Sequence, residues 1–184
     1  IAGGHINGIN SKGVIAVRDK EITEDDVKRV IDTAESVTIP DGRKIIHVIP
    51  QQFIVDEQDS IHDPIGMSAV RLEAETHIVT GSETAIENII KSVERAGFSV
   101  ADIILEPMAA AEAVLNEDEK ELGILVIDIG GGTTDLVIYN EGALWHTAVI
   151  PIGGNHITGD VSFAIKTPNS SAEIIKKNYG STFS

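Results

Sequence analysis

The residues Val126–Asp135, which read VIDIGGGTTD, run from an apolar strand pattern directly into three consecutive glycines. Glycine loses more conformational freedom on folding than any other residue, so three in a row need a reason. One interpretation is a plain hairpin turn between two strands. The other is a loop against which a ligand lies, because backbone N–H groups without neighbouring Cβ atoms suit phosphate oxygens.

The carboxylate of Asp128, at the end of this strand, favours the ligand interpretation. A carboxylate beside a phosphate repels it unless a cation lies between the two charges. We therefore expect Asp128 to hold Mg²⁺ through water, because this ion prefers oxygen ligands and keeps part of its hydration shell. A glycine triplet between two strands is a weak signal by itself, and both interpretations stay open on these residues alone.

Composition excludes several classes of protein. The chain has 184 residues, 42% of them hydrophobic, which is enough for one sizeable core or two small ones. With 14 basic and 29 acidic residues its formal net charge is −15, which repels nucleic-acid backbones, so we expect no nucleic-acid partner. It has no cysteine, which excludes a disulfide scaffold and a thiolate zinc site. No apolar run reaches the roughly 18 to 20 residues that span a bilayer, so we expect a soluble segment.

Hydrophobic periodicity divides the first 80 residues into strands around one helix. The pattern predicts strands at Val14–Val17, Lys44–Ile49, Gln52–Val55 and Arg71–Thr80, a helix that starts at Thr23, and an acidic loop over Asp56–Asp63. Thr23 is a suitable N-cap, and the acidic residues that follow it suit the first turn of a helix. This part therefore predicts a compact α+β unit.

The remainder alternates helices and strands. The pattern predicts helices at Ser82–Gly97, Ala109–Leu115, Asn155–Lys166 and Ser171–Asn178, strands at Asp102–Leu105 and Gly123–Ile129, and a hairpin of Leu136–Tyr139 with Leu144–Ile150. In this arrangement the glycine triplet connects the strand that ends at Ile129 to the hairpin.

Three further groups of residues fit a nucleotide site. Glu106 ends a short predicted strand and could orient water for attack on a phosphoryl group, or it could simply be a solvated acidic helix start. Gly153 and Gly154 precede a helix and offer a second backbone contact for phosphate. Glu173 and Lys176 lie one helical turn apart, and their simplest interpretation is a surface ion pair.

Together, in this order, these pieces resemble the actin-like ATPase superfamily, which includes heat-shock chaperone ATPases, actin and sugar kinases. The resemblance implies ATP and Mg²⁺ as cofactors, with phosphate or Mg²⁺ contacts at Asp128, Gly130, Gly131, Gly132, Thr133 and Thr134. It further implies catalytic roles for Glu106, as the residue that positions water, and for Asp128. Gly153 and Gly154 would contact phosphate, and Glu173 and Lys176 would contact the nucleoside.

Within that superfamily the chain is similar to the bacterial FtsA cell-division family. The similarity rests on Ile1–Ile6 (IAGGHI), Ile46–Asp56 (IHVIPQQFIVD), Asp63–Ser68 (DPIGMS), Arg71–Glu73 (RLE) and Gly153–Asp160 (GGNHITGD). It implies an α/β fold, the actin-like (ribonuclease H-like) ATPase fold, with an inserted strand–helix–strand–strand subdomain. Residues 1–80 would form that subdomain, called 1C, residues 81–120 the returning part of subdomain 1A, and residues 121–184 the first part of subdomain 2A.

The resemblance also implies a cellular role. The family consists of ATP-binding adaptors that polymerise into filaments, anchor the FtsZ ring to the cytoplasmic face of the bacterial inner membrane, and recruit later division proteins. Subdomain 1C would serve self-association and later partners, and its acidic loop could take part. ATP hydrolysis would be slow at most.

Some parts of the family pattern lie outside this sequence, so we expect a fragment of a longer protein. The first phosphate loop, an Asp-x-Gly motif, would precede Ile1, whereas the adenosine loop, the subdomain that binds FtsZ and the membrane-binding amphipathic helix would follow Ser184. We therefore expect this segment alone to bind ATP weakly if at all. Three alternatives compete: the actin-like platform of type IV pili, a sugar or acetate kinase, and a protein-interaction module without nucleotide binding.

Overall fold

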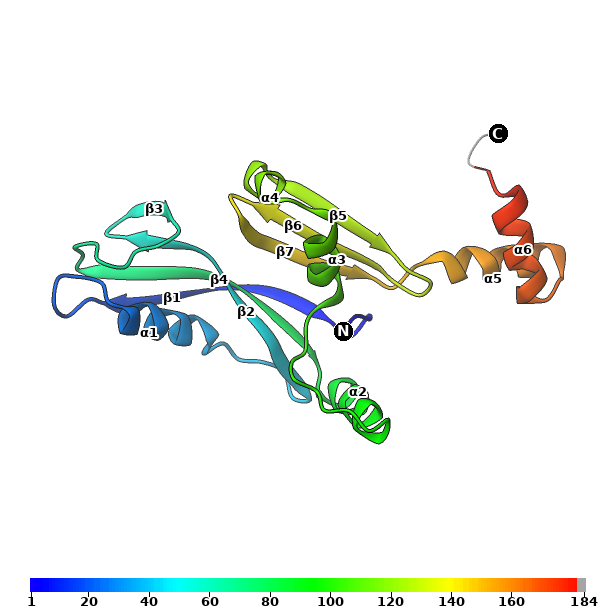
Figure 1. Ribbon diagram of the computed structural model, residues 1–184, viewed down its shortest axis with the longest axis horizontal. Coiled ribbons are helices and arrows are strands. Elements are labelled where there is room, and N and C mark those ends of the chain that lie inside the picture. The colour runs from blue at the N-terminus through cyan, green and yellow to red at the C-terminus, as the bar shows by residue number, and fades with distance from the viewer. Residues whose placement is uncertain (182–184) are drawn as a thin grey trace.

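Two antiparallel sheets lie side by side, with helices packed on their faces and at their ends (Figure 1). The structure is a computed structural model that describes residues 1–181. The strands are β1 (Asn7–Ala16), β2 (Arg43–Val55), β3 (Gln58–Ile61), β4 (Arg71–Ser82), β5 (Ile124–Ile129), β6 (Thr134–Asn140) and β7 (Ala143–Ile150). The helices are α1 (Glu24–Glu35), α2 (Glu83–Arg95), α3 (Glu106–Val114), α4 (Glu117–Leu122), α5 (Gly154–Ile165) and α6 (Asn169–Tyr179).

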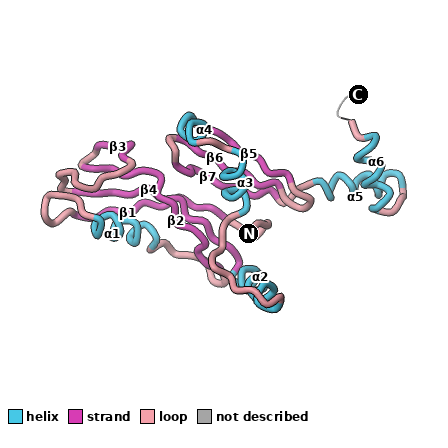
Figure 2. Tube along the Cα trace, in the orientation of Figure 1, coloured by secondary structure: helices cyan, strands magenta, loops and turns pink. Residues whose placement is uncertain are grey.

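The first sheet has the strand order β1-β4-β2-β3, and α1 covers one of its faces (Figure 2). The predicted N-cap is confirmed, because the Thr23 hydroxyl accepts a hydrogen bond from the N–H of Asp26 and the Asp26 carboxylate accepts one from the N–H of Thr23. Val30 and Ala34 of α1 are fully buried against the sheet. A Cβ on Gly13 of β1 would lie 2.1 Å from the carbonyl oxygen of Val30, so the helix packs at a distance that only glycine permits.

The structure corrects the predicted boundaries in this unit. The two strands predicted on either side of Pro50 form the single strand β2, whose register against β4 shifts between Pro50 and Gln52. A proline lacks an N–H for the ladder, and the irregularity accommodates it without ending the strand. The predicted acidic loop Asp56–Asp63 contains β3, which pairs with β2. Its exposed polar side chains concealed this strand from the hydrophobic pattern.

The strand predicted at Asp102–Leu105 is wrong. Within the described residues this segment has no neighbouring strand, and a strand needs a hydrogen-bonded ladder. Its backbone is instead held by single contacts: the N-terminal amine of Ile1 donates to the Ile104 carbonyl, and the N–H of Leu105 donates to Nε2 of His47. The helix α3 begins at Glu106, three residues earlier than the small-residue pattern indicated.

The second sheet, β5-β6-β7, packs one face against α3 and leaves much of the other face exposed. Val137, Tyr139 and Leu144 form a buried cluster with Ala111 of α3. Alternate residues of β5 point the other way, and the side chain of Ile129 is 71% exposed. The strand therefore delivers Asp128, which is half-buried, on the same face as the α3 cluster.

Buried polar groups join the two sheets. The side-chain amide of Gln51 donates to the Trp145 carbonyl at 2.6 Å, and Nε2 of His77 lies 2.8 Å from the hydroxyl of Thr147. His77 is fully buried, and its other ring nitrogen lies 2.6 Å from the Asn10 side chain. Burial, with a smaller contribution from His146, lowers the pKa of His77 to about 4, so its imidazole is neutral near pH 7.

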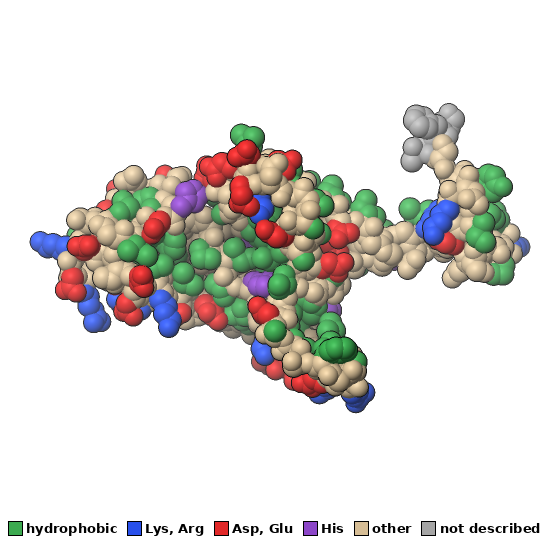
Figure 3. Space-filling view, viewed as in Figure 1, with side chains coloured by type: hydrophobic (Ala, Val, Ile, Leu, Met, Phe, Trp, Pro, Cys, Tyr) green, Lys and Arg blue, Asp and Glu red, His purple; other side chains and the backbone are tan. Residues whose placement is uncertain are grey.

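The helices α5 and α6 pack on each other and project from the end of the second sheet (Figure 1). Figure 3 shows apolar side chains on the surface of this projection. Phe163 of α5 and Tyr179 of α6 are 85% and 78% exposed. Within residues 1–181 no helix combines the length and the apolar character that a membrane crossing requires. The corner between β7 and α5 brings the start of α5 against the glycine triplet.

Candidate functional site

The glycine triplet forms a compact turn after β5. The N–H of Gly130 donates to the Thr133 carbonyl at 2.9 Å, which closes the loop on itself. The backbone of these glycines does not enter the left-handed region, so φ alone does not require glycine here. The requirement comes from close contacts with the start of α5.

Two backbone hydrogen bonds tie the loop to α5. The N–H of Gly154 donates to the Gly130 carbonyl at 2.9 Å, and the N–H of Asn155 donates to the Gly131 carbonyl at 2.8 Å. Gly153 is buried between them, and a Cβ added to it would lie 2.5 Å from the Gly130 oxygen. The two predicted glycine groups therefore meet in space, although 20 residues of strand and turn (133–152) lie between them.

The loop presents an exposed row of N–H groups. Among the described residues, the N–H groups of Gly131, Gly132 and Thr133 have no hydrogen-bond partner. Gly131 and Gly132 are exposed, and a Cβ on Gly132 would meet no atom within 4 Å, so the space in front of the loop is open. Consecutive N–H groups in a concave turn attract anionic oxygens.

The N–H groups of Gly153 and Gly154, which the sequence predicted to contact phosphate, donate hydrogen bonds within the protein instead. The N–H of Gly154 is bonded to the loop, and the N–H of Gly153 donates to Nδ1 of His156 at 3.1 Å. Gly154 therefore acts on the glycine loop directly, by binding the Gly130 carbonyl, whereas Gly153 contributes the close approach of the two backbones.

The two threonines of the motif brace the loop. The hydroxyl of Thr133 donates to Oδ2 of Asp135 at 2.8 Å, and the hydroxyl of Thr134 donates to the Ile152 carbonyl at 2.8 Å. The second bond connects β6 to the segment that leads into α5. Both hydroxyl groups form hydrogen bonds within the protein. Of the two residues, only Thr133 has a free N–H that could bind a ligand.

Asp128 lies directly opposite Asp135 in the β5–β6 ladder. Opposed residues of an antiparallel pair point to the same face of the sheet, so the two carboxylates are neighbours at the edge of the glycine loop. Asp135 is buried, with a side chain that the glycine pattern did not single out. Only the strand register of the folded chain shows that it lies opposite Asp128.

Glu106 occupies the start of α3 and is exposed. The helix packs against β5 and β6, so Glu106 and Asp128 belong to elements in contact. No hydrogen bond or ion pair joins the two carboxylates within the described part of the chain. A role for Glu106 in orienting water remains a prediction.

Glu173 and Lys176 belong to a network that joins α6 to the start of α5. The Lys176 ammonium donates to the Gly154 carbonyl at 3.0 Å and to the Thr158 hydroxyl at 2.8 Å, and it lies 2.7 Å from the Glu173 carboxylate. The Thr158 hydroxyl also contacts that carboxylate. The hydrogen bond from Lys176, supported by Thr158, lowers the pKa of Glu173 to about 2.

The ion pair of Glu173 and Lys176 therefore also links α6 to the start of α5. Lys176 directs all three of its donors into the corner that carries the glycine loop, because Gly154 itself is bonded to the Gly130 carbonyl. Thr158, which sequence reasoning missed, is the buried centre of the network. Its spacing of four residues from Gly154 on one helix face could have indicated the role.

A cleft between α5 and α6 opens beside the network. It has a volume of about 470 Å³ and is lined mainly by Ile157, Val161, Ile175, Lys176 and Tyr179. Apolar walls with a small number of polar or charged groups are typical of pockets for small molecules and cofactors.

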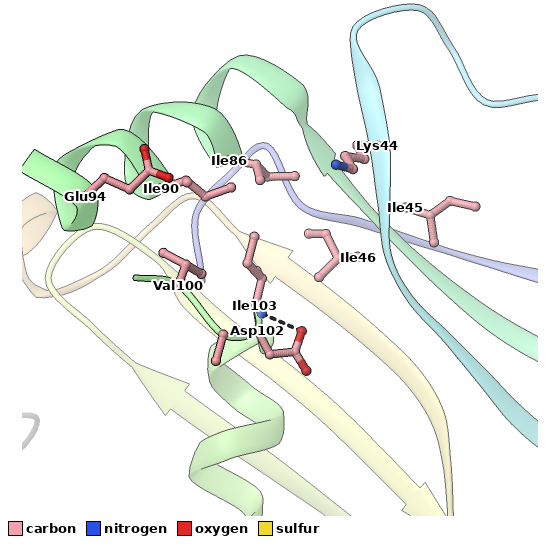
Figure 4. A pocket seen from close by; sticks show the side chains of 10 residues that line it. Lys44, Ile45, Ile46, Ile86, Ile90, Glu94, Val100, Asp102 and Ile103 are labelled. Carbon is pink, nitrogen blue, oxygen red and sulfur yellow. Dashed lines mark hydrogen bonds between the residues drawn. The ribbon is translucent and has the colours of Figure 1, made fainter. Parts of the chain in front are cut away.

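A separate pocket of about 340 Å³ lies under α2 (Figure 4). Ile46 of β2, Ile86 and Ile90 of α2, and Ile103 line it, and Figure 4 shows the Asp102 carboxylate accepting a hydrogen bond from the N–H of Ile103. None of the residues predicted for the nucleotide site lines this pocket.

Comparison with known proteins decides the family. The family model described as "SHS2 domain inserted in FTSA" matches residues 3–80, and the one described as "Cell division protein FtsA" matches residues 125–184. The cell division protein FtsA of Pseudomonas aeruginosa is 50% identical over 179 residues, and that of Neisseria meningitidis serogroup B is 50% identical over 180. The chain belongs to the FtsA family of cell division proteins. It covers 43% and 44% of these two FtsA relatives, so it spans less than half of their length.

A solved structure supports the fold. A chain of the PilM-PilN type IV pilus biogenesis complex superposes with a TM-score of 0.66, covering 94% of this chain and 48% of that chain. The sequence identity of 16% means that this likeness shows the fold alone. The predicted actin-like fold with an inserted subdomain is confirmed, and the much higher identity to FtsA separates this chain from the pilus platform.

Proposed function

We propose that this FtsA-family chain contributes the second phosphate loop of an ATP site. The observation that carries the proposal is the glycine loop, where three successive N–H groups have no partner among the described residues, the space at Gly132 is open, and backbone hydrogen bonds hold the loop in place. A ligand that binds there does not have to order the loop, so little conformational entropy opposes binding. The charge of a triphosphate matches the partial positive charge of the N–H groups.

The residues around the loop fit Mg²⁺ as well. Asp128 and Asp135 supply carboxylates on one face of the sheet, and an oxygen of Asp135 is buried without a partner among the described residues. Bound Mg²⁺ would neutralise charge on the phosphates. Asp128 is the residue we assign to hold it, Gly131, Gly132 and Thr133 would hold phosphate oxygens through their N–H groups, and Gly130, Thr134, Gly153 and Gly154 would keep the loop in shape.

The nucleoside would lie toward α6. The cleft beside Lys176 has apolar walls and lies at the same corner as the loop. Because Lys176 and Glu173 are already bonded to the start of α5, a nucleoside would contact a network that is held rigid before binding.

Glu106 would orient water if ATP is hydrolysed, and the proposal requires only slow turnover.

The complete protein would act as an adaptor in cell division. We propose that bound ATP favours a state that polymerises into filaments, as a ligand that binds one conformation better than another. Through parts that relatives carry beyond the matched length, the protein would hold FtsZ at the cytoplasmic face of the membrane and recruit later division proteins. Residues 1–80, 81–120 and 121–184 would correspond to subdomain 1C, the returning part of 1A and the beginning of 2A.

The experiment is calorimetry of Mg-ATP binding to a full-length FtsA-family protein that contains this segment, and to the segment alone. Gly132→Ala is the decisive variant, because its Cβ meets no protein atom within 4 Å and can only obstruct a ligand. Gly159→Ala is its matched control, since that Cβ also meets open space, in the middle of α5. Asp128→Ala tests the ion.

We expect Gly132→Ala to lose one or two charge-assisted hydrogen bonds to phosphate, which amounts to about a 10- to 100-fold weaker affinity. Gly159→Ala should bind like the wild type, and the segment alone should bind weakly or not at all. Equal affinities for the wild type, Gly132→Ala and Asp128→Ala would refute the proposal. No binding by the full-length wild type would favour an interaction module without nucleotide.

A further inference from the structure

Asn155 places a polar side chain against the glycine loop. It is the second residue of α5 and is exposed. Its backbone N–H donates to the Gly131 carbonyl at 2.8 Å, which fixes the position from which the side chain extends. A Cβ added to Gly131 would lie 2.9 Å from the amide nitrogen of Asn155, so the carboxamide lies directly against that glycine. The position of the amide therefore depends on the absence of a side chain at Gly131.

The carboxamide of Asn155 has no partner within the described part of the chain. It forms no hydrogen bond there, whereas the hydroxyl groups of Thr133 and Thr134 both do. Of these three side chains, only Asn155 keeps its donors free. An asparagine amide carries two N–H donors and one acceptor oxygen, and an amide without a partner can turn either end toward a ligand. The amide lies beside Gly131, whose own N–H is also free.

The first N–H groups of α5 are not available to an anion. Those of Gly154, Asn155 and His156 donate to backbone carbonyl groups at 2.8 to 3.0 Å. A helix N-terminus binds anions through such N–H groups when they lack other partners. Because these three already have partners, a contact from the first turn of α5 to an anion at the loop has to come from a side chain.

We propose that Asn155 is a phosphate-binding residue, and that its amide donates to an oxygen of the phosphate chain bound by the free N–H groups of the glycine loop. The class of ligand is a polyphosphate, such as the triphosphate of ATP. The inference deepens the proposed function and rests on it, because it adds a side-chain donor to a loop that otherwise offers only backbone N–H groups.

The test uses a full-length FtsA-family protein that contains this segment, with Mg²⁺ present. Calorimetry measures the affinity for ATP and, by competition with ATP, the affinity for inorganic tripolyphosphate, which has the phosphates without a nucleoside. Asn155→Leu is the main variant, because leucine has nearly the shape of asparagine but no donor. Asn88→Leu is the matched control, because Asn88 is exposed on α2 and its side chain also forms no hydrogen bond among residues 1–181.

We expect Asn155→Leu to bind both ATP and tripolyphosphate about tenfold more weakly, which corresponds to the loss of one hydrogen bond to a charged group. Asn88→Leu should bind both ligands like the wild type. Without ligand, both variants should melt within about 2 °C of the wild type, because neither amide forms a bond that stabilises the described part of the fold.

Gly131→Ala gives a second readout. Its Cβ would meet the end of a flexible side chain, so it should displace the Asn155 amide and not the backbone. The loss of tripolyphosphate affinity caused by Gly131→Ala should therefore be at least about threefold smaller in an Asn155→Ala background, where the amide is already absent. Equal losses in the two backgrounds would overturn the placement of the amide on which the inference rests.

The outcomes separate this inference from the proposed function. If Gly132→Ala weakens ATP binding but Asn155→Leu matches Asn88→Leu, Asn155 does not bind phosphate and the phosphate loop stands. The inference also fails if Asn155→Leu weakens the binding of ATP but not of tripolyphosphate, since the amide would then contact the nucleoside.

If the wild type does not bind ATP, or if tripolyphosphate does not compete with ATP, both proposals fail. If Asn155→Leu does not fold, Asn155→Ala decides, and an unchanged tripolyphosphate affinity in that variant overturns the inference.

Discussion

Replacing Gly153 by alanine should destabilise the chain through one identifiable contact. Gly153 has φ −154° and ψ −170°, an extended conformation that alanine adopts without strain. The cost therefore comes from packing: the new Cβ would lie 2.5 Å from the Gly130 oxygen and 2.7 Å from both the carbonyl carbon and the oxygen of Gly131. These neighbours are backbone atoms, which cannot move aside as a flexible side chain can.

The loss of unfolding free energy depends on whether the new Cβ stays in an overpacked contact or displaces the glycine loop. Overpacking of a tight contact costs about 1 to 3 kcal/mol. If the loop moves instead, the bonds from Gly154 and Asn155 to its carbonyl groups lengthen, and their loss amounts to about 0.5 to 1.5 kcal/mol each. The two routes give the same range of about 1 to 3 kcal/mol. For a chain of this size, that corresponds to a melting temperature lower by about 2 to 12 °C.

The assay is thermal unfolding followed by circular dichroism, with Gly132→Ala as the control in the same loop. A Cβ on Gly132 meets no atom within 4 Å, so this control should melt within about 1 °C of the wild type. The reasoning is refuted if Gly153→Ala also melts within that margin, or if Gly132→Ala is the more damaging of the two. Either result would show that the loop does not pack on α5 as described.

Three further predictions concern titration and capping. The pKa of His77 is about 4 in the folded chain against 6.5 in the unfolded chain, so the unfolded state binds more protons in this window and stability should fall as pH decreases from 6.5 toward 4. Denaturant unfolding at several pH values should show a smaller fall in His77→Gln; an equal slope would contradict this. Thr23→Ala removes the hydroxyl that caps α1 and should cost about 1 kcal/mol in the same assay, whereas Thr23→Ser should cost less. Lys176→Met should raise the carboxyl pKa of Glu173 from about 2 toward 4.5, measured by carbon NMR; an unchanged value would mean that Lys176 is not its main partner.

The sequence alone determined the features that depend on local chemistry. The start of α1 followed from Thr23 and the acidic first turn, because a capping box is complete within four residues. The strand before the glycine triplet and the hairpin after it followed from apolar alternation and turn residues. Resemblance to the actin-like ATPase superfamily, and within it to the FtsA family, added the fold and the roles implied for the candidate residues, which periodicity could not supply.

The tertiary structure decided whatever depends on a partner distant along the chain. The segment Asp102–Leu105 has a strand-like composition, yet within the described residues it lacks a neighbouring strand to complete a ladder. Gly153 requires glycine because its Cβ would strike the backbone of Gly130 and Gly131, a contact made across an intervening hairpin.

In the glycine-loop site, too, the sequence determined some features and the tertiary structure decided others. The stretch Val126–Asp135 indicated a phosphate loop, but only the fold showed which of its N–H groups are free and which are bonded to α5. It also placed Asp135 opposite Asp128 and left one carboxylate oxygen buried without a partner among the described residues. Strand register and burial are properties of assembled elements, and no single segment of sequence contains them.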